Sequence, residues 1–167
     1  IAIDADSGER QWSSRYLGSG VISAPTVVNG TVYAGAGPYN DAGPLYAVDA
    51  ATGEVEWEFS TPDGIRRYGG PTVYDGIVYV GTAGGELYAV DAETGEQEWI
   101  FSNPSRPIKS GPTVLDNTVY FVTQVSIYAV DTVTGEQEWV LDADGGSRSS
   151  PTIVQNPEAG DSVGSRV

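Results

Sequence analysis

Ala129-Val130-Asp131-Thr132-Val133-Thr134-Gly135-Glu136-Gln137-Glu138-Trp139 is the stretch of sequence that decides the fold of this chain. The same pattern, Ala-x-Asp-x-x-Thr/Ser-Gly-x-x-x-Trp, recurs at residues 2–12, 47–57 and 89–99. All four tryptophans of the chain occupy the last position of this motif, at successive spacings of 45, 42 and 40 residues. A period of about 40–45 residues with strand-like content is typical of β-propeller blades.

A second repeated block precedes the later motifs and completes the unit. Pro-Thr followed by a β-branched residue occurs at positions 25–27, 71–73, 112–114 and 151–153. After the first three blocks, the pairs Asn-Gly, Asp-Gly and Asp-Asn separate two apolar runs, which is typical of β-hairpins. A third strand ends at the Asp of the motif and a fourth carries the Trp. Each unit therefore predicts four short antiparallel strands, and the chain shows no helical pattern.

These units predict one all-β domain over residues 1–167. Three complete blades are expected at 23–60, 70–102 and 111–142, and a fourth is split between 150–167 and 1–13. Two architectures remain open: the ends close a four-bladed ring, or the chain is an arc of a larger propeller. In an arc, the cut blade edges would invite pairing with another copy of the chain.

The composition excludes several kinds of function. The chain has 167 residues, enough for one domain with a sizeable core, and contains neither Cys nor His. It therefore has no residues for a disulfide, a thiolate nucleophile or His-dependent catalysis. Eight basic and 23 acidic residues give a net charge of −15, so we expect no nucleic-acid partner. No apolar run is long enough for direct membrane insertion.

Lysine is almost absent, because Lys109 is the only one among the eight basic residues. This composition resembles that of proteins from extreme halophiles, in which molar salt shortens the screening length to about 3 Å. We therefore expect a halophilic host and greater stability in 2 M than in 0.1 M KCl. The chain begins with Ile1 rather than Met, so we also expect it to be a piece of a longer protein.

The repeated motif resembles the blade repeat of the quinoprotein-like propellers, the PQQ-binding-like repeat family. With the Pro-Thr block, the resemblance covers nearly the whole chain. It implies that each Trp packs between neighbouring blades close to the Ala, while the Asp and Thr order the turn. The docking residues implied in this way are Ala2, Asp4, Trp12, Ala47, Asp49, Trp57, Ala89, Asp91, Trp99, Ala129, Asp131 and Trp139.

The family includes dehydrogenases with a quinone cofactor and also non-enzymatic members, similar to the outer-membrane assembly lipoprotein, that act as protein-binding scaffolds. The dehydrogenases hold PQQ and Ca²⁺ beside a catalytic Asp and typically a vicinal disulfide. This chain has no Cys, and its Trp residues all fall on the docking position. We therefore expect no catalytic residue and no cofactor. PQQ and Ca²⁺ are expected only under the alternative that the chain is a fragment of a PQQ-dependent dehydrogenase.

No metal site is expected either. The aspartates of the motif recur in register, as turn-forming residues do. The segment Asp4-Ala5-Asp6-Ser7-Gly8 has some likeness to a calcium loop. However, its Gly falls one place early and no Glu follows at the required distance.

One asymmetry in the charge pattern indicates a candidate binding surface. Six of the eight basic residues lie between a Trp and the next Pro-Thr block, in the segments that join one blade to the next. All such segments emerge on the same face of a propeller, so this acidic chain is expected to carry a basic ring there. Two tyrosines adjoin the ring. The candidate binding residues are Arg15, Tyr16, Arg66, Arg67, Tyr68, Arg106, Lys109 and Arg148.

Two interpretations of this ring remain open. Arg binds carboxylates and phosphates in a bidentate manner, which favours docking of an acidic peptide or small anion. Alternatively, the ring pairs locally with Asp63, Asp142 and Asp144 and relieves charge repulsion.

The leading functional prediction is a non-catalytic scaffold that binds a protein or peptide partner through this face, in an extracytoplasmic or cell-surface location. Besides the dehydrogenase fragment, a further alternative is the extracellular sensor domain of a membrane kinase.

Overall fold

The computed structural model describes residues 1–14, 17, 20–21, 23–37, 43–65, 69–102, 106–108, 110–142 and 150–154. This part of the chain forms β-strands and no helix, and so holds no helix that could span a membrane. The strands are β1 Ala2–Ile3, β2 Arg10–Trp12, β3 Thr26–Val28, β4 Thr31–Gly35, β5 Leu45–Asp49, β6 Val55–Phe59, β7 Thr72–Tyr74, β8 Ile77–Gly81, β9 Glu86–Asp91, β10 Gln97–Ser102, β11 Thr113–Leu115, β12 Thr118–Val122, β13 Ser126–Asp131 and β14 Gln137–Asp142.

The strands form propeller blades of the expected kind. β3–β6, β7–β10 and β11–β14 each make a four-stranded antiparallel sheet in simple sequence order, and β1 and β2 make a two-stranded sheet. We call the three sheets blades 1, 2 and 3, and the pair β1–β2 the half-blade. Each of the three ranges expected for a complete blade contains one sheet. The split blade stays a prediction, because residues 155–167 lie outside the described part.

The alternating strand direction gives each blade two ends. The hairpin between its first two strands and the turn within its motif share one end, which we call the turn face. The loop between its second and third strands and the connection to the next blade share the other, the connection face. At the turn face, Asn29 and Gly30 have φ angles of 51° and 86°, and Asp75 and Gly76 have 48° and 76°. These positive angles match the twist that a two-residue hairpin needs.

The motif introduces the same irregularity into every sheet. In blade 1, Ala47 pairs with Trp57, and the register then shifts between Ala47 and Val48. Ala129 pairs with Trp139 in blade 3, with a shift at the equivalent step. The shift is a β-bulge, in which one extra residue of the fourth strand, such as Glu56 in blade 1, is left without a partner. A bulge bends the strand and increases its twist. The repeat therefore presents each Trp in the same way along the chain.

The buried core lies between blades rather than inside any one of them. One cluster combines Leu45 and Ala47 of blade 1 with Val78 and Val80 of blade 2. A second cluster combines residues such as Leu87 of blade 2 with Val119 and Phe121 of blade 3. Burial of this apolar surface, at about 25 cal/mol per Å², holds neighbouring blades together.

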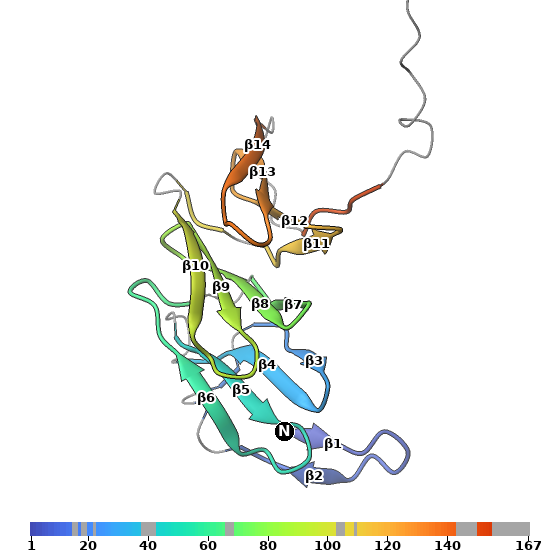
Figure 1. Cartoon of the computed structure of the whole chain (residues 1–167). Coiled ribbons are helices and arrows are strands. Elements are labelled where there is room, and N and C mark those ends of the chain that lie inside the picture. The colour runs from blue at the N-terminus through green and yellow to red at the C-terminus, as the bar shows by residue number, and fades with distance from the viewer. Residues whose placement is uncertain are drawn as a thin grey trace, which may run out of the picture.

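The blades follow one another in an open arc. Figure 1 shows the half-blade at one end of this arc and β13–β14 at the other, with the two ends apart. Of the two architectures left open by the sequence, the described residues adopt the arc. The core ends where the arc ends, so the two terminal sheets each keep one face uncovered.

Candidate interaction surfaces

The aspartate of each motif orders its own turn. In blade 1, Oδ1 of Asp49 accepts hydrogen bonds from the backbone N–H groups of Ala51 (3.0 Å) and Thr52 (2.7 Å). It also accepts one from the Thr52 hydroxyl at 2.8 Å. Gly53 then continues with a φ of 77°. Backbone bonding of the same kind is made by Asp4, Asp91 and Asp131.

These hydrogen bonds favour the ionised carboxylates. The pKa of Asp49 is lowered from 3.8, first by the Thr52 side chain and then by its backbone N–H. The pKa values of Asp4, Asp91 and Asp131 are lowered as well, chiefly by the backbone N–H of Ser7, Thr94 and Thr134. A carboxylate with these partners is a poor general base, because it holds its charge and has little tendency to take up a proton.

The tryptophan of each motif docks on the turn of the next blade. Nε1 of Trp57 donates to the Ala92 carbonyl oxygen at 3.0 Å, and the Tyr33 hydroxyl donates to the same oxygen at 3.1 Å. The indole covers Gly95, where an added Cβ would lie 2.8 Å from the ring.

The other two junctions between consecutive sheets repeat this contact. Trp12 donates to the Ala50 carbonyl at 2.7 Å and covers Gly53. Trp99 donates to the Thr132 carbonyl at 2.9 Å and covers the glycine of the third turn. Each junction thus combines an indole hydrogen bond with a glycine that leaves room for the ring.

The threonine of the Pro-Thr block links the inner strands. Thr26 Oγ1 donates to the carbonyl of Pro71 at 2.5 Å, and Thr72 Oγ1 donates to that of Pro112 at 2.5 Å. Thr113 Oγ1 donates to the carbonyl of Pro151 at 2.9 Å. The first two bonds join neighbouring blades, and the third joins blade 3 to the segment that follows it.

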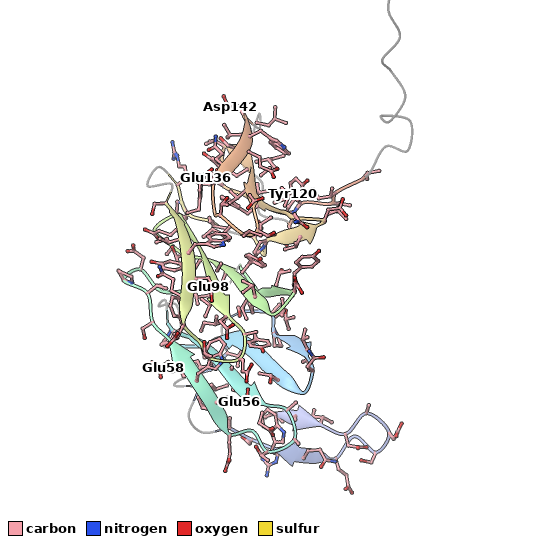
Figure 2. The ribbon with its side chains drawn as sticks, in the orientation of Figure 1. Glu56, Glu58, Glu98, Tyr120, Glu136 and Asp142 are labelled. Atoms are coloured by element: carbon pink, nitrogen blue, oxygen red, sulfur yellow. The ribbon has the colours of Figure 1, made fainter. Side chains whose placement is uncertain are left out.

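Two crevices open between the blades near the turn face. The one between blades 1 and 2 has a volume of about 360 Å³ and is lined by Glu56, Asp91 and Glu93. The one between blades 2 and 3, of about 240 Å³, includes Asp75 and Glu98. Figure 2 shows Glu56 on β6 and Glu98 on β10, the outermost strands of their blades. Neither crevice is lined by a basic residue, so both would repel an anionic ligand.

Tyr79 is a buried residue that lines the crevice between blades 2 and 3. Tyr79 lies there among apolar residues, and desolvation raises its pKa to about 12. Its hydroxyl lies 3.5 Å from the Thr132 carbonyl oxygen. Tyr79 therefore stays protonated and serves as a packing residue with a polar tip.

The connection face is built on two buried isoleucines. Ile65, in the connection from blade 1 to blade 2, packs on Gly35, where an added Cβ would lie 2.8 Å from its side chain. Its backbone exchanges hydrogen bonds of 2.8 and 3.2 Å with Gly43. Ile108 packs on Gly81 in the same way, in the next connection. Each of these two connections is therefore anchored by one buried isoleucine.

A shallow hollow of about 210 Å³ lies beside the first of these anchors. It is lined by Gly43, Pro44 and residues 60–64. Thr61 Oγ1 is buried there without a hydrogen-bond partner among the described residues. Asp63 also lines the hollow, close to Gly84 of blade 2.

The structure places only part of the predicted basic ring. Arg106 lies in the connection between β10 and β11, and it is exposed. The other candidate binding residues are outside the described part of the chain: Arg15, Tyr16, Arg66, Arg67, Tyr68, Lys109 and Arg148. Of the carboxylates proposed to pair with the ring, Asp142 accepts a hydrogen bond from Ser126 at 3.2 Å, and Asp144 is outside the described residues. The ring therefore stays a prediction.

Two features of this surface were missed by the sequence reasoning. Ile65 and Ile108 both precede a Pro by a few residues, while Gly35 and Gly81 both end a second strand. This recurrence is a signal that could have revealed the anchors. The Pro-Thr block recurs as well. Its recurrence does not reveal the hydrogen bond from Thr to the next Pro, because Thr is also a common strand residue.

The described residues do not fit PQQ with Ca²⁺. No group of three or more Asp or Glu among them could hold a metal ion. The indoles of Trp12, Trp57 and Trp99 lie against the turn glycines of the next sheet. The motif aspartates are engaged by their own turns.

Residues 1–107 match the model of a family described as outer membrane protein assembly factor BamB. Among curated proteins, no match is found.

Solved structures share the fold. BamB from Moraxella catarrhalis superposes with a TM-score of 0.72 at 23% identity, covering 89% of this chain and 44% of that protein. A quinohemoprotein alcohol dehydrogenase from Comamonas testosteroni gives 0.62 at 28% identity, covering 74% and 21%. One from Pseudomonas putida gives 0.63 at 26% identity, covering 74% and 20%. The chain thus spans less than half of each of these proteins.

Proposed function

Since the chain belongs to the PQQ-like β-propeller family described as outer membrane protein assembly factor BamB, we propose that it is a non-catalytic scaffold that binds a protein or peptide partner through its connection face. The family description and the fold shared with BamB support a scaffold. They also support an extracytoplasmic location, which we include in the proposal.

The observation that carries the choice of face is the different use of the two ends of each blade. On the turn face, the motif carboxylates and glycines are engaged by their own turn or by the preceding Trp. On the connection face, the buried anchors Ile65 and Ile108 hold segments that also carry the exposed cation Arg106. A rigid base that leaves a charged group available suits recognition, because little order is lost on binding.

Charge then indicates the chemistry of the partner. The crevices near the turn face carry carboxylates and no basic residue. The connection segments hold six of the eight basic residues of the chain. An acidic peptide would be steered away from the former and towards the latter.

Binding of a fluorescently labelled Asp/Glu-rich peptide tests this proposal. We expect replacement of Arg66, Arg67 and Arg106 by Gln to weaken binding at least tenfold in 0.1 M salt, because arginine–carboxylate pairs are lost. Arg10→Gln is the matched control, since this exposed cation lies in β2 rather than in a connection. Equal affinity of the triple variant and the wild type would show that the ring pairs locally instead.

The dehydrogenase similarities favour a second candidate, a fragment of a quinone-dependent enzyme. Titration of the chain with PQQ and Ca²⁺ separates the two. A saturable change in the quinone absorption together with dye reduction would support the dehydrogenase fragment. Peptide binding without either signal would support the scaffold.

A further inference from the structure

Large apolar side chains are exposed at both ends of the arc. In blade 3, Trp139 is 42% and Leu141 58% exposed. In the half-blade, Ile1 is 77% and Ile3 63% exposed. The equivalent side chains at internal junctions are half-buried or buried. The two ends of the arc therefore expose surfaces that internal junctions cover.

The exposed residues of blade 3 are those that elsewhere contact the next blade. Leu141 occupies the repeat position of Phe59 and Phe101. Phe59 packs on Tyr88 with ring centroids 5.4 Å apart, and Phe101 packs on Tyr128 at 5.9 Å. Leu141 has no such neighbour among the described residues. Blade 3 thus presents a donor face.

The half-blade presents the matching acceptor face. Ile1 occupies the repeat position of Tyr88 and Tyr128, and Ile3 that of Val90 and Val130. Both valines are fully buried against the preceding blade. The exposed isoleucines therefore lie where a preceding blade would cover them.

The docking turn of the half-blade is formed and open. Asp4 orders it as in the other motifs, and Gly8 has a φ of 72°. An added Cβ at Gly8 would meet no atom within 4 Å, whereas at Gly53, Gly95 and Gly135 it would meet a tryptophan. Among the described residues, no side chain donates to the carbonyl of Ala5, the equivalent of Ala92.

The tryptophan that fits this turn is already oriented. Trp139 packs on Tyr120 with centroids 5.8 Å apart, the same separation as in the pairs Tyr33–Trp57 and Tyr79–Trp99. The inner strands are complementary as well. Thr152 and Pro25 are both exposed, and they occupy the repeat positions that form the threonine-to-proline bonds at internal junctions.

We propose that, in a solution of the 167-residue chain, the donor face of one copy docks on the half-blade of a second copy, and that two such junctions close a ring. Nε1 of Trp139 donates to the Ala5 carbonyl of the other copy, its ring covers Gly8, and Leu141 packs on Ile1. The contact joins different surfaces and forms a ring only if its rotation closes. The superposition covers 44% of the BamB chain, so two copies correspond to most of that chain's length. This inference rests on the fold and not on the proposed function.

The mass of the 167-residue chain in solution tests the proposal. Each copy carries a charge of −15, so sedimentation is measured in 1 M KCl, where screening limits repulsion to about 3 Å. We expect a dimer of twice 17.5 kDa. Trp139→Ala and Ile3→Glu should each dissociate it at the same concentration. Val133→Ser is the matched control, because Val133 is 74% exposed but lies outside both end faces, and it should stay dimeric.

A mixing experiment tests that the contact joins two different faces. Trp139→Ala retains an intact half-blade and Ile3→Glu retains an intact donor face, so a mixture should form a heterodimer through one junction. Each variant alone should stay monomeric. A monomeric wild type with a Trp139→Ala stability loss equal to that of Trp57→Ala would show closure within one chain and overturn the proposal. A dimer that survives both substitutions would overturn it as well.

Discussion

The internal junctions and the open ends of this arc are built from the same residues with different surroundings. At the junction of blades 1 and 2, Trp57 lies on Gly95 and donates to Ala92. At the end of blade 3, Trp139 packs on Tyr120 as Trp57 packs on Tyr33, but Trp139 is exposed. The motif therefore orients its Trp within its own blade. The Trp buries apolar surface and stabilises the fold only where a neighbouring blade packs on it.

The largest expected difference between the two regions comes from the tryptophans. We expect Trp57→Ala to lower the free energy of unfolding by about 3–5 kcal/mol, because it empties an internal junction. Trp139→Ala should cost less than about 1 kcal/mol in the monomer, because its side chain is partly in water. Urea denaturation at low protein concentration measures both. Equal losses would mean that the end of blade 3 is covered within the chain.

Gly95→Ala and Gly8→Ala form the next pair. Both glycines have a positive φ, so each alanine variant is expected to lose about 1–2 kcal/mol from backbone strain alone. At Gly95 the new Cβ would also lie 2.8 Å from Trp57, which adds about 1–3 kcal/mol of overpacking. Thermal unfolding of the two variants should therefore show the larger shift for Gly95→Ala. A larger shift for Gly8→Ala would contradict the open turn of the half-blade.

A smaller difference is expected for the inner-strand hydrogen bonds. Thr72→Val removes the donor to the Pro112 carbonyl and should cost about 1 kcal/mol. Thr152→Val should change the stability of the monomer by less, since Thr152 is exposed and donates to no described residue. Chemical denaturation of both variants provides the measurement. A cost at position 152 as large as that at 72 would argue against an open end.

The smallest expected contrast concerns pH, because the aspartate turns are complete at both places. The folded pKa values of Asp4 and Asp91 are lowered from 3.8. Their contribution is therefore full above about pH 4 and is lost as the pH falls through the lowered values. We expect Asp4→Asn and Asp91→Asn to narrow the difference in urea midpoint between pH 7 and pH 3 by similar small amounts. An effect confined to Asp91→Asn would show that the turn depends on a docked Trp.

Much of this fold follows from the sequence, because its determinants are local. Asn29-Gly30 and Asp75-Gly76 predict hairpins, and the structure gives both pairs positive φ angles. Four Trp at blade spacing predict a propeller, and the family match and the fold of BamB confirm it. The choice between ring and arc did not follow, because the angle between two sheets depends on packing across the junction. The repeat pattern is the same in both architectures.

The candidate binding surface was less accessible to sequence reasoning. Clustering of Arg and Lys after each Trp is visible in the sequence, but whether each cation pairs locally depends on side-chain positions. The structure describes Arg106 alone from that set. The exposure of Trp139 was also not predicted, since its motif has the same Ala, Asp, Thr, Gly and Trp positions as the motifs of blades 1 and 2.

The carbonyl oxygen that receives each indole has a consequence for how such chains diverge. Trp12, Trp57 and Trp99 recognise a backbone atom of the residue after the motif Asp, and that residue is Ala50, Ala92 or Thr132. The side chain of this residue takes no part in the bond, so we expect its substitution to leave the indole hydrogen bond intact. Because the three described junctions all use this backbone carbonyl, duplication or deletion of a whole blade would keep the same contact between neighbouring blades.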